Sequence, residues 1–192
     1  MNPISDEELN KIVEQVVSSL MRQMPSQQTA SPAGKAGSAQ PIPQSEQRTV
    51  AIGADHGGYQ LKETLKEMLR KEGYAVIDCG TGGTESVDYP DFARQVAENV
   101  ASGAAWRGVM IDGAGIGSCM AANKVPGVRA AMCYDHATAY NSREHNNANL
   151  LTLGAGLIGA NLAGQILKTF LETEFGGGRH ARRVNKIMQI EK

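Results

Sequence analysis

From residue 49 onward, short aliphatic runs alternate with longer segments in which apolar residues recur at helical spacing. Short apolar runs are typical of strands, and the amphipathic segments between them are typical of helices. The alternation predicts an α/β domain in which a parallel sheet carries helices on both faces. The expected strands are Thr49–Ala54, Ala75–Asp78, Gly108–Ile111, Val128–Cys133 and Leu150–Leu153, and the expected helices are Tyr59–Glu72, Tyr89–Ser102, Ser118–Lys124, His136–Glu144 and Gly159–Glu172.

A separate apolar pattern precedes this domain. Aliphatic and methionine side chains recur at helical spacing between Leu9 and Met24, and polar residues occupy the opposite face. Ser5 and Glu8 supply a capping box at the helix start. Residues 1–24 are therefore predicted to form an isolated amphipathic helix. Its apolar stripe needs a partner, which would be its own domain, its copy in an oligomer, or a groove on another protein.

Residues 25–48 are dominated by Gln, Ser, Pro, Ala and Gly and lack the aliphatic spacing that a core requires. This composition predicts a flexible linker. The expected organisation is a helix over residues 1–24, a linker over 25–48 and a single globular domain over 49–192.

Charge and cysteine usage narrow the possible partners and the compartment. The chain has 192 residues, with 19 Lys plus Arg against 20 Asp plus Glu, so no net basic field would attract nucleic acid or a membrane surface. The sequence has neither a long apolar span nor a signal-like N-terminus. The three cysteines form no C-x-x-C pair, which favours a reduced, cytoplasmic setting.

Polar or glycine-rich residues follow three of the five expected strands, at 53–58, 112–118 and 134–136. Ligands gather where parallel strands end, so these three segments are expected to converge. The loop from Asp112 to Ser118 has three alternate glycines before a helix, which lets backbone amides approach an enediolate or phosphate oxygen. A tight strand-to-helix turn would account for the glycines equally well.

Other candidate groups are ionisable. Asp55 and His56 form an acid/base pair after the first strand; helix capping would explain Asp55 but not His56. His145 lies in a polar run, where an isolated histidine is often a surface residue. Arg179 and Arg183 are four residues apart, so on a helix they would share a face and grip one phosphate; a solvated basic helix start is the alternative.

Several segments together resemble the type B ribose-5-phosphate isomerase family, which includes galactose-6-phosphate isomerase subunits and tetrulose-phosphate isomerases. The resemblance spans about residues 49–190. It implies a Rossmann-like three-layer αβα domain with a five-stranded parallel sheet, a homodimer or homotetramer with an active site shared between subunits, and no metal or organic cofactor. The segments that carry it are Ala54–Gly58, Asp88–Pro90, the loop running into Ala121–Lys124, Arg143–Asn147 and Gly177–His180.

The resemblance also implies a role for each matching position on a phosphorylated sugar. Asp55 and His145 would open the sugar ring, His56, Arg179 and Arg183 would hold the phosphate, Asn146 would contact sugar hydroxyls, and backbone amides from Gly113 through Gly115 to Gly117 would stabilise the enediolate.

The chain departs from the family where the proton-transfer base is expected. Asp112 replaces the usual Cys, Ser118 stands where another branch has Glu, and Ala114 replaces a Thr or Ser. Asp112 is therefore predicted to be the base, since a carboxylate can shuttle a proton across a cis-enediolate, with Cys119 the second candidate.

The predicted activity is aldose–ketose isomerisation of a sugar phosphate, with ribose 5-phosphate and ribulose 5-phosphate favoured. The alternatives are an isomerase of a tetrose or hexose phosphate, or a non-catalytic sugar-phosphate binding or scaffold protein. The order of N-terminal helix, linker and catalytic domain resembles that of encapsulation peptides of bacterial microcompartments. This second resemblance implies that residues 5–24 bind a shell protein and that the cytoplasmic enzyme is packaged inside the compartment.

Overall fold

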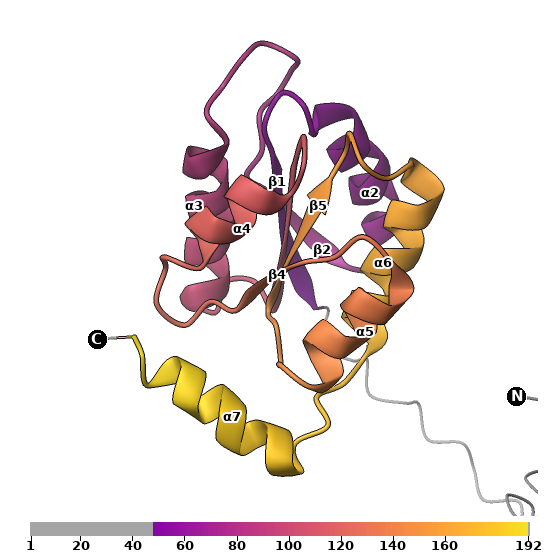
Figure 1. The fold of residues 1–192 in the computed structure, drawn as a ribbon. Helices are drawn as coiled ribbons and strands as arrows, with labels where there is room; N and C mark the ends of the chain where they lie inside the picture. Colours follow the sequence, from indigo (N-terminus) through magenta and orange to yellow (C-terminus); the bar gives the residue numbers. More distant parts are fainter. Residues whose placement is uncertain (1–47, 192) are drawn as a thin grey trace, which may run out of the picture. The chain divides into compact units, whose positions relative to one another are not determined.

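A computed structural model of the protein describes residues 48–191, and the predicted N-terminal helix and nearly all of the predicted linker lie outside these residues. Five strands form one sheet in the order β2-β1-β3-β5-β4 (Figure 1), and every neighbouring pair is parallel. The strands are β1 (Thr49–Ala54), β2 (Ala75–Asp78), β3 (Arg107–Asp112), β4 (Ala130–Met132) and β5 (Leu150–Gly154).

Helices cover both faces of the sheet, so the predicted three-layer α/β architecture is confirmed. The core on one face is built with α2, α5 and α6, and the core on the other with α3 and α4. The helices are α2 (Tyr59–Lys71), α3 (Tyr89–Ala101), α4 (Ile116–Ala122), α5 (His136–Glu144), α6 (Ala160–Glu172) and α7 (Gly178–Met188).

The central strands are buried on both faces, which explains why their sequences are continuous apolar runs. Successive residues of a strand point to opposite faces, so Ile52 and Ile111 pack toward α2 and α6, while Ala51 and Met110 pack toward α3 and α4. Within residues 48–191 no helix is long and apolar enough to cross a membrane.

β4 is shorter than predicted. The expected strand was Val128–Cys133, whereas the observed strand covers only Ala130–Met132. Polar side chains replace the ladder at its start: the Arg129 amide donates to Oδ1 of Asn149 at 2.7 Å, and Oδ1 of Asn123 accepts from the Ala130 amide at 2.8 Å. Side chains that bond to the backbone in this way compete with strand pairing. The hydrophobic pattern of the sequence does not show where this occurs.

Candidate active site

Two of the three segments expected to converge do meet at the carboxyl edge of the sheet. The Asp55 amide donates to the Ile111 carbonyl at 3.2 Å, and a Cβ placed on Gly58 would lie 2.4 Å from the same oxygen, so only glycine fits there. Residues 134–136 do not join them, because β5 lies between β3 and β4 in the sheet. The loop after β5 takes their place, with the Ala155 amide donating to the Asp112 carbonyl at 2.8 Å.

The Asp112 side chain is buried, and both of its carboxylate oxygens accept hydrogen bonds from its own loop. Oδ1 accepts from the amides of Ala114, at 2.8 Å, and Gly115. Oδ2 accepts from the Ser118 amide at 3.1 Å and from its hydroxyl at 2.5 Å. A carboxylate has about four lone-pair sites, and here each has a donor. The geometry therefore assigns Asp112 to holding the loop, and it leaves no lone pair for a substrate proton.

Asp112 accepts hydrogen bonds from three amides of its loop, and other amides of the same loop have no protein acceptor among the described residues. Within residues 48–191, the amides of Gly113, Ile116 and Gly117 donate to no protein group. Gly115 adopts a φ of 79°, which places the chain at the start of α4 and strongly favours glycine. The expected amide donors thus remain at Gly113 and Gly117, Ile116 is added, and the amide of Gly115 is already engaged.

The Asp55 carboxylate lies near the start of this loop, and only one of its two oxygens accepts a hydrogen bond from residues 48–191. Asp55 as a residue is 7% exposed, and its Oδ1 accepts from the Gly58 amide at 3.0 Å. Among residues 48–191, no donor lies on Oδ2. A Cβ built on Gly57 would be 3.4 Å from Asp55 Oδ1 and 3.6 Å from the Gly113 nitrogen, so Gly57 separates the carboxylate from the first amide of the loop.

The His56 ring is exposed, and a hydrogen bond to its Nδ1 fixes its orientation. Its Nδ1 accepts from the Val87 amide at 3.2 Å. In a neutral imidazole the second nitrogen then carries the proton, so Nε2–H is the free donor. His56 can therefore present a donor to an anionic oxygen at this edge.

Tyr89 is a site residue that the sequence analysis did not assign. A Cβ built on Gly117 would lie 2.5 Å from the Tyr89 hydroxyl, so the ring lies directly on the glycine loop, and the side chain is 38% exposed. The available signal was the Asp88–Pro90 turn, which contributed to the family resemblance without a role. Cys119 points elsewhere, with its Sγ 3.4 Å from the Ala130 carbonyl on β4.

The remaining predicted site residues form a second, basic cluster. The rings of His145 and His180 stack with centroids 4.3 Å apart, and Nε of Arg179 donates to Nε2 of His180 at 3.4 Å. His145 is held on both nitrogens, by the Asn141 amide group at 2.7 Å and by Oε2 of Glu144 at 3.2 Å. Arg179 and Arg183 both lie on α7, four residues apart.

The surroundings of the His180 imidazole act on its pKa. Desolvation lowers its pKa, and the nearby His145, Arg179 and Arg183 lower it further, against a smaller opposite effect of Glu144. A lowered pKa favours the neutral His180 ring at physiological pH.

A buried arginine holds the turn that carries His145 and Asn146. Arg143 donates from Nε to the Thr173 carbonyl at 3.2 Å, and from Nη1 to Asn147 Oδ1 at 2.9 Å and to the Ala148 carbonyl. Burial lowers the pKa of Arg143 to about 10, which still leaves it charged at neutral pH. The turn is thereby tied to the chain that leads into α7.

The two clusters lie at opposite edges of the sheet. Asp55, His56 and the Asp112 loop follow the carboxyl ends of β1 and β3, whereas His145 follows α5 and α7 follows α6, at the edge where strands begin (Figure 1). β3 has six residues, and at about 3.3 Å per residue it separates the edges by roughly 20 Å. One copy of the chain therefore does not bring the predicted site residues together.

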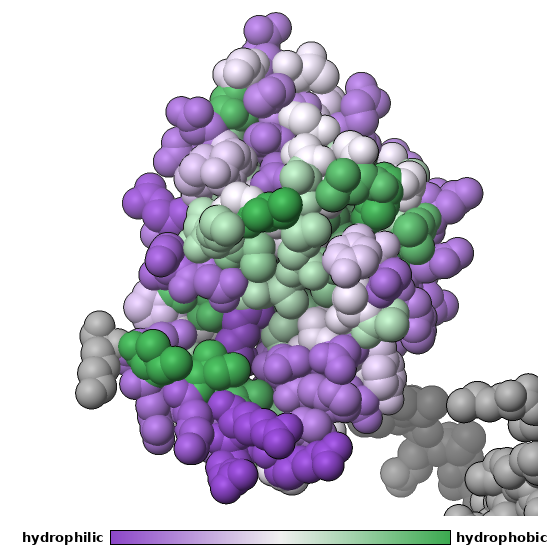
Figure 2. Space-filling model, in the orientation of Figure 1, coloured by the Kyte–Doolittle hydropathy of each residue, from purple (hydrophilic) through white to green (hydrophobic). Residues whose placement is uncertain are grey.

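A cavity of about 590 Å³ opens on the face formed by α4, β4, α5 and α7. Asn146 lies on its wall, with its amide group donating to the Asn141 backbone and side-chain oxygens at 3.1 Å. Hydrophobic residues gather over this face and along α7 (Figure 2). Ile187, which lines the cavity from α7, is 47% exposed, and Met120 of α4 is 65% exposed. In the part of the chain that the structure describes, no group of three or more His, Cys, Asp or Glu side chains is placed to hold a metal ion.

The sequence matches the family model described as Ribose/Galactose Isomerase over residues 50–187. It is 42% identical over 144 residues to ribose-5-phosphate isomerase B of Escherichia coli (strain K12), covering 75% of this chain and 97% of that protein. It is also 42% identical over 144 residues to D-erythrulose-4-phosphate isomerase of Pectobacterium atrosepticum, covering 74% and 95%. The solved structure of Clostridium thermocellum ribose-5-phosphate isomerase B is similar with a TM-score of 0.74 and 56% identity, covering 74% of this chain and 97% of that one.

Proposed function

The chain belongs to the ribose/galactose isomerase family, and from this premise we propose that it interconverts ribose 5-phosphate and ribulose 5-phosphate through a cis-enediolate. One observation supports the chemistry most directly: the Asp55 carboxylate and the free Gly113 amide lie on either side of Gly57, and Gly113 begins the loop that also carries the free amides of Ile116 and Gly117. An enediolate needs donors for its developing oxygen charge and a nearby group to move a proton. Each preorganised donor in comparable sites accelerates catalysis by about 10² to 10³.

In the proposed reaction, Asp55 Oδ2 takes the proton from C2 of the open-chain aldose. The C–H electron pair forms the C1–C2 double bond, and the carbonyl electrons move onto O1, where the loop amides hold the negative charge. Asp55 then returns the proton to C1, the O2–H electron pair forms the C2=O bond, and the O2 proton passes to O1, which completes the ketose. Asp55 replaces Asp112 in this role because Asp112 has no unoccupied lone pair, and Cys119 is excluded because its thiol faces β4.

The proposed site is completed by a second copy of the chain. His56 would hold the phosphate from the carboxyl edge of one copy, and Arg179 and Arg183 would grip it from the amino edge of the other. His145 and Asn146 of the second copy would assist ring opening and contact sugar hydroxyls. The exposed apolar face around the 590 Å³ cavity supports such an association, because solvent-exposed apolar surface favours burial in an oligomer. A homodimer suffices for this arrangement, and a homotetramer built from such dimers also satisfies it.

The four-carbon alternative has a specific observation in its favour. A relative named for ribose 5-phosphate and one named for D-erythrulose 4-phosphate are both 42% identical to this chain. A panel of four-, five- and six-carbon sugar phosphates distinguishes them, and the full chain is expected to show its highest kcat/KM with ribose 5-phosphate. Binding of these compounds without turnover of any would contradict the isomerase proposal and favour a binding or scaffold role.

Mixing two inactive variants tests the shared site with the same assay. Asp55→Asn disables the carboxyl edge, and the double variant Arg179→Ala with Arg183→Ala disables the amino edge. In a mixed dimer one of the two sites keeps both intact edges, so equal mixing through co-expression is expected to restore about a quarter of wild-type activity, given random pairing in a two-fold dimer. Activity no greater than the sum of the separate variants would show that each site belongs to one chain.

For the N-terminal extension, which lies outside the described residues, the proposal is that residues 5–24 bind a microcompartment shell protein. The apolar stripe and the following linker support it, since an amphipathic helix on a tether can enter a groove on a partner. A fusion of residues 1–48 to a fluorescent protein is expected to form puncta in cells that assemble shells. Diffuse fluorescence in those cells, with puncta from a known cargo as control, would contradict packaging.

A further inference from the structure

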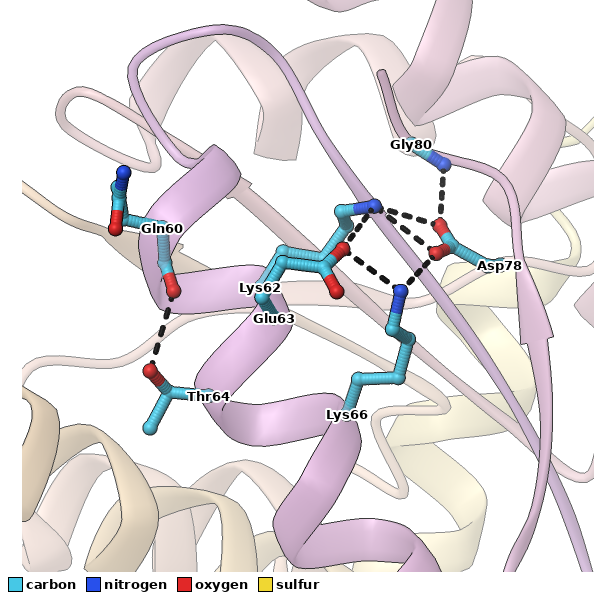
Figure 3. A network of polar contacts seen from close by, with 7 residues as sticks. All are labelled: Gln60, Lys62, Glu63, Thr64, Lys66, Asp78 and Gly80. Carbon is cyan, nitrogen blue, oxygen red and sulfur yellow. Dashed lines mark hydrogen bonds and ion pairs between the residues drawn. The ribbon is translucent and has the colours of Figure 1, made fainter. Parts of the chain in front are cut away.

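A cluster of ion pairs around one buried lysine lies next to the carboxyl edge of the sheet (Figure 3). Lys62, in the first turns of α2, is only 1% exposed. Its Nζ lies 2.9 and 3.0 Å from the two oxygens of Asp78 and 2.9 Å from Glu63. Lys66 joins the cluster, 2.6 Å from Asp78 and 2.7 Å from Glu63. Burial raises the pKa of Asp78, but hydrogen bonds from Lys66, Lys62 and the Gly80 amide outweigh it and lower that pKa overall.

Stability alone is a weak reason for burying Lys62. Removing a lysine from water costs several kcal/mol, and well-packed apolar residues often serve as well as a buried ion pair. The contacts of the cluster indicate another purpose, because Asp78 ends β2 and begins the loop of residues 79–88. Asp78 Oδ1 accepts from the Gly80 amide at 3.0 Å, and the Lys62 stem lies against Gly80, where a Cβ would be 2.6 Å from Lys62 Cδ.

The far end of this loop reaches the candidate active site. The Val87 amide donates to His56 Nδ1 at 3.2 Å, and Tyr89 follows with its ring on Gly117. Lys62 also contacts the site through its own helix, since its backbone amide donates to the Gly58 carbonyl at 2.9 Å. Lys62 thus links both supports of the His56 ring: the turn that carries it and the loop that bonds to its Nδ1.

We propose that Lys62 and Asp78 are a positioning pair, which fixes the loop of residues 79–88 and thereby holds His56 as an Nε2–H donor for the phosphate of the substrate. Neither residue is expected to touch the reacting atoms. The effect on catalysis rests on the proposed isomerase function, whereas the effect on the His56 ring does not.

The test is Lys62→Met in the full chain, which keeps much of the apolar stem and removes the charge. Asp78 retains Lys66 and the Gly80 amide as donors, so it is not left unpaired. Loss of the Val87 hydrogen bond frees the His56 ring, and KM for ribose 5-phosphate is expected to rise about fivefold, the equivalent of one hydrogen bond, while kcat per folded site stays within about twofold.

The His56 tautomer supplies a readout that a purely structural role would not move. The chain has four histidines, so nitrogen spectra of histidine-labelled protein at pH 8 are simple, and His56→Gln assigns the His56 signals. The wild type is expected to show the Nε2–H form, and Lys62→Met a mixture of both tautomers. Lys66→Met is the matched control, because it removes a charge from the same carboxylate one turn later, and it is expected to keep the wild-type signals.

If folded Lys62→Met keeps the wild-type His56 tautomer and the wild-type KM, the proposal is overturned. It is also overturned if Lys66→Met shows mixed tautomers and a raised KM. If Lys62→Met does not fold, Asp78→Asn takes its place with the same two outcomes, since asparagine keeps an oxygen for the Gly80 amide. If no sugar phosphate is turned over, the isomerase proposal fails, and the tautomer measurement still decides the positioning claim.

Discussion

Replacing Asp55 with asparagine is expected to lower kcat for ribose 5-phosphate by about a thousandfold, within the range that a general base contributes. Asparagine offers no carboxylate oxygen to take the C2 proton, but its Oδ1 can still accept from the Gly58 amide. The turn should therefore survive, and Tm should fall by no more than about 4 °C, the equivalent of roughly 1 kcal/mol. Steady-state kinetics and thermal unfolding of the same preparation check both expectations.

The outcome that would contradict this role for Asp55 is activity within tenfold of the wild type. A large loss of Tm would instead show that Asp55 serves mainly the turn at the start of α2. Asp55→Glu tests whether the position of the carboxylate matters as well as its charge. The variant keeps a carboxylate but moves it by one methylene, so kcat should fall with little change in stability.

Replacing Asp112 with asparagine is expected to lower the free energy of unfolding by about 3 kcal/mol and kcat by about a hundredfold. The new amide group would face the Ser118 backbone amide, so a donor would oppose a donor where the carboxylate now accepts. The loop would rearrange, and the N–H groups of Gly113 and Gly117 would no longer point toward the same substrate oxygen. Urea unfolding and steady-state kinetics measure the two effects.

Ser118→Ala is the matched control for Asp112, because it removes a single donor from the same carboxylate. It is expected to cost about 1 kcal/mol of stability and little activity. An Asp112→Asn variant that is as stable as the wild type yet inactive would reverse the assignment and make Asp112 the base, as the sequence alone had suggested.

The fold could be predicted from the sequence because each element has one dominant physical signal. Strands buried on both faces must be continuously apolar, as in β1 and β3, and amphipathic helices must turn one stripe toward the sheet, as in α2 and α6. The apolar pattern was less informative at the start of β4, because a hydrogen bond to the Asn149 side chain replaces strand pairing at Arg129. The predicted start of β4 was therefore two residues too early.

The candidate residues could also be identified from the sequence, but their tasks could not. Two carboxylates follow neighbouring strands, and their environments differ: both oxygens of Asp112 accept hydrogen bonds from its own loop, whereas one oxygen of Asp55 accepts from the Gly58 amide. Asp112 folds back onto its own loop because Gly115 takes a positive φ, and a sequence does not show which lone pairs such a turn will occupy. Lys62 was simply one polar position on an amphipathic helix, and its burial depends on the loop that β2 happens to present.

The order of the expected helices and strands already indicated that the site residues form two clusters. His145 lies between an expected helix and the next expected strand, which places it at the edge where strands begin. Asp55 lies between a strand and the next helix, at the other edge. Element order alone therefore indicated that one chain could not hold both groups in one pocket.

Exchange of solvent deuterium into C2 of ribose 5-phosphate tests the central claim most directly, because it follows the proton transfer itself. The account predicts that Asp55→Asn lowers the exchange rate by about a thousandfold, while Asp112→Asn lowers it by only about a hundredfold. Exchange that persists in Asp55→Asn and disappears in Asp112→Asn, with both variants folded, would contradict it.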